Sequence, residues 1–410
     1  MQAEQRGYEV VVVGGGVVGM SVALELDAAG TDVLLVDRDR LGGASTSRNA
    51  GGVRHQFYQD ANILAALETS ARLRQLVAED GPVDYRQVGY LLLYTDDAQR
   101  DRLAEGVVRQ NALGVDTRMI APDEIAEIAP DVDLDGVLGA CFGPTDGYLD
   151  PILLAAALRN RVLRSGVRVL EGTAVHRIES DGDRATGVVT AVGTIPAGTV
   201  VNCAGAWAPT LARSYGGDLP IVPRRSQVFV MADVPPLSPT MPHTFDCGSR
   251  FYVRPHQRDV WSGAAFKPIL DEAPPTPGMA AEWVEAEELA RRVGRRVPAL
   301  AGRPFTRAWA GVIEVTPDDN PVLGWTHLAN VYSAAGFSGH GICIGMGLAP
   351  SIGAEIRGGE PAIPLDIFRP QRFSDGSPAK LEGLWLQARP SRYEQWLASG
   401  PAAPQAGVTR

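Results

Sequence analysis

A glycine-rich turn near the start of the chain constrains its fold more than any other feature. The turn, Gly14–Gly19 (GGGVVG), follows a run of β-branched residues at 9–13 and precedes apolar residues at helical spacing over 17–29. A second apolar run at 31–37 completes a strand, helix and strand pattern. Such a unit is typical of a nucleotide-binding fold, because free N–H groups at the helix start bind phosphate.

Each of three glycines in this turn has a physical role in holding a dinucleotide. A glycine at 14 permits the tight turn, one at 16 lets the backbone approach the pyrophosphate, and one at 19 lets the helix pack closely on the strand. Asp37 ends the second strand, where its carboxylate can bind a ribose 2′-hydroxyl and would repel the 2′-phosphate of NADP. The predicted cofactor contacts here are Gly14, Gly16, Val17, Val18, Gly19, Asp37 and Arg38.

The composition is that of a globular, acidic protein. Of 410 residues, 45% are hydrophobic and 21% are charged, and this composition disfavours disorder. The net charge of −10 disfavours a nucleic-acid partner. The four cysteines lie far apart without a C-x-x-C pair, so we expect neither a metal site nor a disulfide framework. We find no export signal and no membrane span, and we expect a cytoplasmic protein.

The rest of the chain predicts a second domain inserted into the nucleotide-binding fold. Residues 220–304 are rich in proline and aromatic residues and contain strand-like runs, whereas the glycine-rich character returns from 307. The predicted fold class is α/β (α+β overall), a Rossmann-like domain interleaved with a mainly antiparallel β-sheet substrate domain. The predicted boundaries are 1–90, 147–219 and 305–373 for the cofactor domain, 91–146 and 220–304 for the substrate domain, and 374–410 for a C-terminal extension.

Local signals also place individual elements. We expect helices over 60–79 and 97–113 and a third helix through 163, with Asp150 as its N-cap and Pro151 in its first turn. Strands are expected at 88–94, 227–231, 250–254 and 260–265, and residues 331–356 predict a strand, a glycine loop and a helix.

Four motifs, in a consistent order, carry a resemblance to a known family. They are the Gly14–Gly19 turn, the small-residue segment 43–54, Val201–Trp207 (VNCAGAW) and Gly336–Gly341 (GFSGHG). Over roughly residues 8–373 the chain resembles the FAD-dependent amine and amino-acid oxidoreductases, which include D-amino acid oxidase, glycine oxidase and sarcosine oxidase. Residues 49–57 and 309–318 are most similar to the sarcosine oxidase β and proline dehydrogenase β branch.

The resemblance implies FAD as cofactor and oxidation of a C–N bond. A hydride would pass from the carbon that bears the nitrogen to flavin N5, and the resulting imine would be hydrolysed. The substrate would be a small secondary or primary amine or amino acid, sarcosine-, glycine- or proline-like, with oxygen or an electron-accepting partner as second substrate and a homo- or hetero-oligomeric state left open. The further cofactor contacts it implies are Ser45, Ser47, Arg48, Asn49, Gly51, Gly52, Val175, Ala204, Gly205, Trp207, Gly311, Gly336, Gly339, His340, Gly341 and Ile342.

The candidate catalytic residues are Arg54, Tyr252, Trp261 and His340. Arg54 is the first candidate for binding a substrate carboxylate, because a guanidinium offers a planar, bidentate fork. Tyr252 matches an active-site tyrosine of the family, and Arg250 and Arg254 are expected on its face of a strand. Glu314 is expected to be a glutamate of a surface turn, and the alternative is that it contacts the amine or orients a flavin-facing loop.

Three departures from monomeric sarcosine oxidase qualify the resemblance. Gly311 stands where that enzyme bonds its flavin covalently, so noncovalent FAD is expected. Trp261 stands where it has an oxygen-activating lysine, and Lys267 follows six residues later. Ile342 and Cys343 stand where it has a second cation for the carboxylate, so efficient use of oxygen and simple sarcosine specificity are both put in doubt.

Two other functions remain open on the same fold. Oxidation of a 2-hydroxy acid or of glycerol phosphate uses the same flavin chemistry, and fold does not fix function. A protein that holds FAD in an assembly without turnover is a second alternative. A flavin hydroxylase is disfavoured, because the C-terminal third has no Gly-Asp-Ala type motif.

Overall fold

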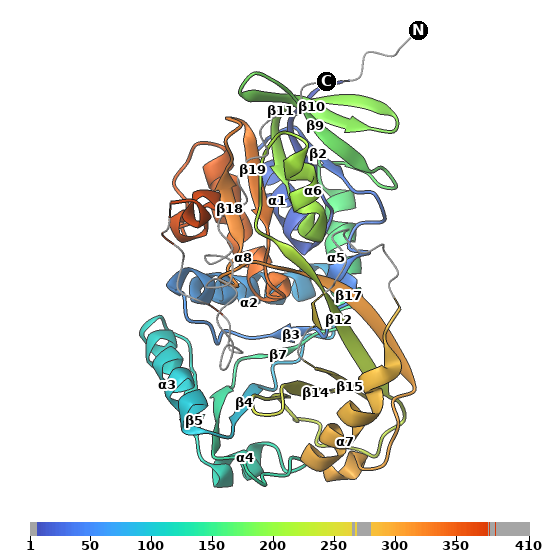
Figure 1. Ribbon diagram of the computed structural model, residues 1–410, viewed down its shortest axis with the longest axis vertical. Helices are drawn as coiled ribbons and strands as arrows, with labels where there is room; N and C mark the ends of the chain where they lie inside the picture. Colours follow the sequence, from blue (N-terminus) through green and yellow to red (C-terminus); the bar gives the residue numbers. More distant parts are fainter. Residues whose placement is uncertain (1–5, 265–266, 269–279, 376, 378–381, 383–410) are drawn as a thin grey trace.

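The computed structural model describes residues 6–264, 267–268, 280–375, 377 and 382, with only the backbone at 267–268. Two large β-sheets occupy the two ends of the molecule and are covered by helices (Figure 1). One is mainly parallel and carries the glycine turn, and the other is mainly antiparallel. The predicted fold class, a Rossmann-like unit interleaved with a second sheet, is thereby confirmed.

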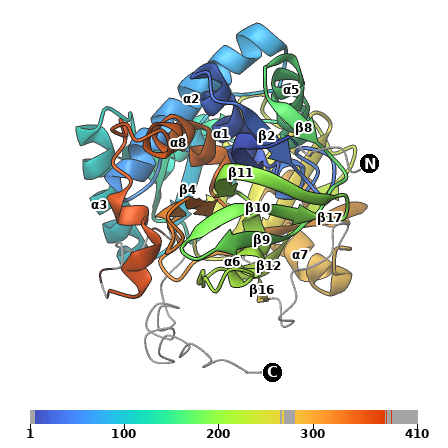
Figure 2. The ribbon, with the colours of Figure 1, turned by 90° about the horizontal axis from the view of Figure 1, so that it is seen from above.

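The first sheet is parallel at its centre. Its strands lie in the order β18-β19-β11-β1-β2-β8, and β1 pairs in parallel with both β11 and β2. The β9–β10 hairpin, which precedes β11 in the chain, pairs with β11 through β10, and these three strands lie side by side in Figure 2. The strands are β1 (Tyr8–Val13), β2 (Val33–Val36), β8 (Arg168–Leu170), β9 (Val175–Asp181), β10 (Arg184–Thr190), β11 (Gly193–Asn202), β18 (Val322–Trp325) and β19 (Val331–Ala335).

Both faces of this sheet are buried, as a parallel sheet requires. Side chains alternate along β1, so Val10 and Val12 pack into one hydrophobic core and Val11 and Val13 into another. Residues of α1, α2, α5 and α8 complete the first core, and residues of α6 complete the second. The helices are α1 (Val17–Ala28), α2 (Asp60–Asp80), α5 (Pro151–Arg164), α6 (Ala208–Arg213) and α8 (Gly341–Ile356).

The second sheet has the order β16-β12-β15-β14-β13-β4-β6-β5, with β17 also paired to β12. All its pairs are antiparallel except β13 with β4. Its strands are β4 (Tyr90–Tyr94), β5 (Arg118–Ile120), β6 (Gly139–Gly143), β12 (Val222–Met231), β13 (His243–Asp246), β14 (Phe251–His256), β15 (Asp259–Ala264), β16 (Lys267–Pro268) and β17 (Arg307–Val315). The helices near it are α3 (Asp97–Ala112), α4 (Pro122–Ile128) and α7 (Ala286–Arg296).

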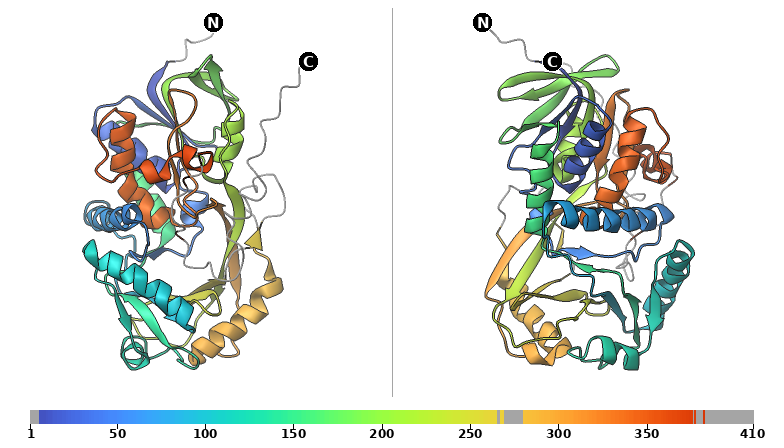
Figure 3. Two further views of the ribbon diagram at one scale, coloured as in Figure 1. Left: turned by 60° about the vertical axis from the view of Figure 1, so that its left-hand side comes forward. Right: turned by 180° about the vertical axis from the view of Figure 1, so that it is seen from behind.

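Between the two sheets lie α2 and a small two-stranded sheet. The helix α2, blue in Figure 3, crosses the middle of the molecule, and β3 (Gly52–Val53) pairs with β7 (Gly147–Tyr148). Short 3₁₀ turns at Ser45–Ser47 and Gly205–Trp207 follow the first sheet's strands. The segment before α2 therefore passes from the glycine-rich half of the molecule toward the second sheet.

Several local expectations are confirmed. The Asp150 side chain accepts hydrogen bonds from the N–H groups of Ile152 and Leu153, and Pro151 opens α5. One sheet boundary differs from the expected division: the chain segment from 305 begins with β17, which pairs with β12 over nine residue pairs. The crossing from the second sheet to the first therefore lies after Val315. We propose the rest of the domain division unchanged, and most of the expected extension over 374–410 falls outside the described residues.

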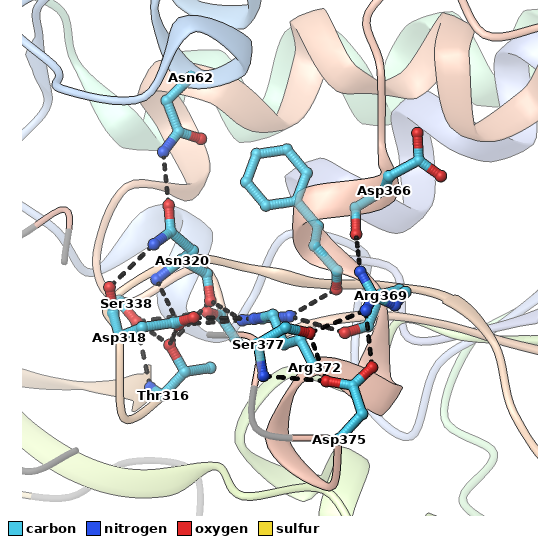
Figure 4. Close-up of polar contacts among 12 residues, drawn as sticks. Asn62, Thr316, Asp318, Asn320, Ser338, Asp366, Arg369, Arg372, Asp375 and Ser377 are labelled. Atoms are coloured by element: carbon cyan, nitrogen blue, oxygen red, sulfur yellow. Dashed lines mark hydrogen bonds and ion pairs between the residues drawn. The ribbon is translucent and has the colours of Figure 1, made fainter. Parts of the chain in front are cut away.

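A buried ion pair anchors the loop that follows β17 (Figure 4). The guanidinium of Arg372 donates to both carboxylate oxygens of Asp318, at 2.8 and 2.9 Å, and both side chains are almost completely buried. Asn62 of α2 donates to the Asn320 side chain at 2.9 Å, and the Thr316 hydroxyl donates to the Asn320 carbonyl. The loop is thus held between α2 and the turn at 370–373.

We predict that Arg372→Met lowers the free energy of unfolding by about 3 kcal/mol or more, because it leaves the Asp318 carboxylate buried without its counter-ion. The measurement is the midpoint of urea unfolding at pH 7.

Arg369→Met is the matched control. Arg369 pairs with Asp375 at the surface, and its loss should cost about 1 kcal/mol or less. Equal losses in the two variants would contradict the structural role assigned to Arg372.

Candidate functional site

A cavity of about 1080 Å³ lies where the two sheets meet. Its first wall is built from the loops that follow the carboxyl ends of β1, β2, β11 and β19, where parallel sheets bind ligands. Its second wall comes from β12, β13, β14 and β17 of the other sheet. The segment 44–54 lines the cavity between these walls.

The glycine turn has the close contacts that its sequence predicted. Gly14 has φ +105°, and a Cβ there would overlap the carbonyl oxygen of Cys203 at the end of β11. A Cβ on Gly19 would overlap the Gly14 carbonyl oxygen, so α1 packs tightly against the turn. The Val17 N–H donates to the Thr46 hydroxyl at 2.9 Å. Gly14, Gly16, Val17 and Val18 thus bring the glycine turn and the start of α1 to the cavity, where a helix N-terminus can bind a pyrophosphate.

Asp37 and a stacked cation form another part of the wall. The Asp37 carboxylate accepts from the N–H groups of Gly15 at 2.6 Å and Asp39 at 2.7 Å, and burial raises its pKa. The Arg38 guanidinium lies 3.7 Å from the centre of the Trp207 ring. A carboxylate beside a flat cation–π pair suits a ribose and an adenine ring.

The first part of the segment 44–54 is tied to β17. The Ser45 hydroxyl donates to the Val312 carbonyl at 2.6 Å, and the Trp309 indole N–H donates to the Arg48 carbonyl at 3.1 Å. A Cβ on Gly311 would lie only 3.1 Å from Cβ of Arg48. A glycine at 311 therefore permits this close approach.

Arg54 places a buried positive charge in the cavity. Its side chain is 5% exposed, lies 4.2 Å over the Phe57 ring and donates to the Gln56 carbonyl. Its other terminal nitrogen lies 3.3 Å from Nε2 of His340, the residue that precedes α8. Burial, with a contribution from Arg54, lowers the pKa of His340 to about 3, so the imidazole is uncharged and accepts from the guanidinium.

The second wall brings an aromatic cluster to the same space. The rings of Tyr90 and His243 stack at 4.2 Å with an interplanar angle of 10°, and Tyr252 is tilted against His243 at 5.2 Å. All three residues line the cavity together with Arg54 and Cys343. Sequence reasoning identified Tyr252 and placed Cys343 where the family has a cation for the carboxylate. It missed Tyr90 and His243 as cavity residues, because their neighbours in space come from strands that are distant in sequence.

Glu314 corrects one expectation. It was expected in a surface turn, but it belongs to β17 and lines the cavity, where its carboxylate is 3.9 Å from the position of a Cβ on Gly205. Its backbone carbonyl accepts from the Ser338 N–H at 2.9 Å. Burial raises the pKa of Glu314 to about 7. The signal that was available is its place in an apolar run typical of a strand.

Most of the predicted site residues share this cavity. Those that line it are Gly14, Gly16, Val17, Val18, Asp37, Arg38, Ser45, Arg48, Asn49, Gly51, Gly52, Arg54, Val175, Ala204, Gly205, Trp207, Tyr252, Gly311, Gly339, His340, Gly341 and Ile342. Gly19, Ser47 and Gly336 are not among the lining residues. Gly19 and Gly336 instead permit close packing, since a Cβ on Gly336, which has φ +75°, would lie 2.6 Å from the Thr316 methyl group.

The structure does not bring Trp261 to the cavity. Its ring is 6% exposed and packs against the Arg254 guanidinium at 4.1 Å and the Trp309 ring at 4.8 Å. Trp261 is not among the residues that line the cavity, so the structure does not bring it together with Arg54, Tyr252 and His340. The Lys267 side chain lies outside the described residues.

These features fit FAD. The glycine turn and the start of α1 would hold the pyrophosphate, and the group of Asp37, Arg38 and Trp207 would hold the adenosine end. The loop at 336–341 precedes α8, whose N-terminus would favour negative charge on the flavin. Among the described residues no cluster of three or more His, Cys, Asp or Glu is placed to hold a metal ion, and no helix is long and apolar enough to cross a membrane.

Comparison with known proteins agrees with this arrangement. The family model for FAD dependent oxidoreductases (DAO) matches residues 9–352. The chain is 29% identical over 376 residues to 4-methylaminobutanoate oxidase (formaldehyde-forming) of Paenarthrobacter nicotinovorans and 28% identical over 388 residues to mitochondrial dimethylglycine dehydrogenase of Rattus norvegicus. Each alignment covers 89% of this chain and 45% of the relative, so the chain spans about half their length. The crystal structure of L-proline dehydrogenase from P. horikoshii matches with a TM-score of 0.84 at 29% identity, covering 92% of this chain and 100% of that chain.

We predict that Glu314→Gln makes stability less dependent on pH. The pKa of Glu314 is raised by folding to about 7, so its stabilising effect is complete below the pKa of the unfolded chain and is lost as pH rises through about 7. The variant should therefore gain in free energy of unfolding relative to the parent between pH 5 and pH 8. Urea unfolding across this range measures it.

Glu360→Gln, at an exposed turn, is the control. The pKa of Glu382 is also raised by burial to about 7, but that residue is present in every variant and does not affect the difference. A Glu314→Gln curve parallel to that of the parent would show that the carboxyl titrates alike in both states.

Proposed function

Because the chain belongs to the FAD dependent oxidoreductase family, we propose that it oxidises the C–N bond of a small secondary or primary amine or amino acid to an imine. The resemblance carried by the four motifs is confirmed, and the cofactor is FAD. The substrate we propose is sarcosine-, glycine- or proline-like. The names of the relatives, which act on methylaminobutanoate, dimethylglycine and proline, support an amine that also carries a carboxylate.

The observation that carries this proposal is the Arg54 guanidinium. It is almost fully buried, lines the cavity and has no carboxylate partner among the described residues. A buried cation without a counter-ion is costly, and a ligand carboxylate would relieve that cost. The contacts with Gln56, Phe57 and His340 fix the plane of the guanidinium before a ligand arrives.

The chain's own residues then prepare the substrate for oxidation. Arg54 would bind the carboxylate, and uncharged His340 would position Arg54 without repelling it. The positive charge of Arg54 disfavours an ammonium group beside it, so the amine would bind with its lone pair free. Tyr90, His243 and Tyr252 would exclude water from the wall. FAD, when bound, supplies the oxidation by accepting a hydride.

We further propose that FAD is held without a covalent bond. Gly311 lines the cavity at the position where a monomeric sarcosine oxidase has its flavin-linked cysteine, and glycine offers no side chain for such a link. Acid precipitation tests this directly: the yellow colour should remain in the supernatant. Colour that stays with the precipitate would overturn it.

We predict that Arg54→Met raises the dissociation constant of an amino-acid substrate roughly a hundredfold, because it removes a buried cation from a carboxylate. Anaerobic bleaching of the flavin at increasing substrate concentration measures the constant. The same amine as its carboxamide should be affected far less.

Arg54→Lys is the companion variant. It keeps the charge but loses the planar fork, so it should fall between the parent and Arg54→Met. Equal loss for the acid and the carboxamide would contradict the assigned role of Arg54.

The function itself is tested by anaerobic bleaching of the wild-type protein. N-methyl amino acids, proline, glycine, D-amino acids and 2-hydroxy acids are offered in parallel. Bleaching by hydroxy acids alone would sink the amine proposal, and bleaching by none would support a flavin-holding role without turnover. Repeating the best substrate in air with peroxide detection then separates use of oxygen from transfer to an electron-accepting partner.

A further inference from the structure

We propose that His243 is a further catalytic residue, whose uncharged imidazole accepts a hydrogen bond from the amine nitrogen of the bound substrate. This inference rests on the proposed function and adds to it a contact for the nitrogen. No motif of the sequence pointed to this residue. His243 lines the cavity, and its buried Nδ1 has no hydrogen-bond partner among the described residues.

The imidazole is held rigidly in the cavity wall. His243 begins β13 and is paired in register with Tyr90 of β4, which brings the two rings into a stack. Tyr252 also contacts His243, from β14, the strand next to β13 in the sheet. A ring packed against two others has few rotamers to lose when it binds a ligand, so little conformational entropy opposes the contact.

The imidazole also lies beside the backbone that carries Arg54. A Cβ on Gly52 would lie 3.3 Å from Nε2 of His243 and 3.2 Å from the Tyr90 ring. Gly52 precedes Arg54 by two residues, and its carbonyl accepts from the Cys343 thiol at 3.3 Å. An amine and a carboxylate a few bonds apart, as in an amino acid, would therefore meet His243 and Arg54 respectively.

One ring nitrogen of His243 lacks a side-chain partner. The residue is 2% exposed, and its Nδ1 is buried without a hydrogen-bond partner among the described residues. Buried polar groups in native proteins are almost always hydrogen-bonded, because leaving one unpaired costs its full desolvation energy. Since His243 lines the cavity, a ligand group is the natural partner.

Burial and two nearby guanidinium groups keep His243 uncharged. Burial, then Arg254 and Arg54, lower the pKa of His243 well below its ordinary value. Arg254 is fully buried between the rings of Trp261 at 4.1 Å and Tyr148 at 4.8 Å, and its guanidinium nitrogens have no hydrogen-bond partner among the described residues. The titratable and charged groups that face His243 are Tyr90 from β4, Tyr252 and Arg254 from β14, and Arg54 after β3.

An uncharged imidazole offers one acceptor and one donor. The two nearby guanidinium groups disfavour a charged ammonium, so the amine that binds is neutral and its N–H can donate to His243. This contact would direct the nitrogen lone pair and the adjacent C–H bond. It also defines a preference: a primary or secondary amine keeps an N–H to donate when neutral, and a tertiary amine does not.

The test compares His243→Phe with His243→Gln in the holoenzyme. The first variant keeps a flat ring without hydrogen bonding, and the second keeps an amide donor and acceptor. Two titrations are run on each: anaerobic bleaching by the best amine substrate, and the change in flavin absorbance on binding the same carboxylic acid without its amine. His243→Phe should raise the dissociation constant of the amine substrate about tenfold or more. The same variant should leave the dissociation constant of the amine-free acid within about twofold of wild type. His243→Gln should largely restore the wild-type value for the amine substrate.

Equal loss for both ligands would show a merely structural role, and no loss for either would overturn the contact. His327→Phe is the matched control, because that histidine packs against Tyr215 outside the cavity. Should His243→Phe fail to fold, His243→Asn decides, since a shorter amide that retained full amine response would contradict the geometry.

The pH profile gives an independent readout. The rate of anaerobic flavin bleaching by the amine should depend on pH in the same way in wild type and in His243→Gln between pH 6 and pH 9, because the imidazole is uncharged throughout. If a pH-dependent change in this rate is present in wild type and absent in the variant, His243 titrates in this range, which contradicts the proposal. If no amine bleaches the wild-type flavin, the proposed function fails and this inference falls with it. If wild type and His243→Phe bleach alike, this inference alone fails.

Discussion

The antiparallel pairing of β12 with β17 is the constraint on which the rest of the structure depends. These strands share nine residue pairs and run between the two ends of the molecule in Figure 1. They set the second sheet at a fixed place relative to the carboxyl ends of the first sheet's strands, where a parallel sheet binds its ligand. The hydrogen bonds from Ser45 to Val312 and from Trp309 to Arg48 then fasten the segment 44–54, which lines the cavity, to β17.

Buried positive charge is the second organising feature. Arg54 and Arg254 are both nearly or fully buried, and neither has a carboxylate partner among the described residues. Burial, with the field of Arg54 and for His243 also that of Arg254, lowers the pKa of His243 and of His340, so both imidazoles are uncharged. Under the proposed function, such a cavity would favour an anionic group and a neutral amine, the protonation state from which a hydride can leave. The stacking of Arg254 between two aromatic rings offsets part of the cost of burying it.

Prediction from the sequence succeeded where a local pattern has one physical explanation. The glycine turn, the cap at Asp150 and the strand, loop and helix over 331–356 each depend on neighbours within a few residues, and the structure reproduces them. It failed for side chains whose surroundings come from distant strands. Trp261 was expected at the flavin and instead fills the layer behind the wall, and Glu314 was expected at the surface and instead lines the cavity.

The sequence by itself determined the nucleotide-binding unit, the order of the cofactor motifs and the family, because these depend on backbone conformations that only glycine and small residues allow. The tertiary structure decided which side chains meet in the cavity. Tyr90, His243 and Tyr252 come from three strands, β4, β13 and β14, and their pairing in register brings the rings together. That register, and the exclusion of water that shifts the pKa values of His243, Glu314 and His340, exist only once both sheets have packed.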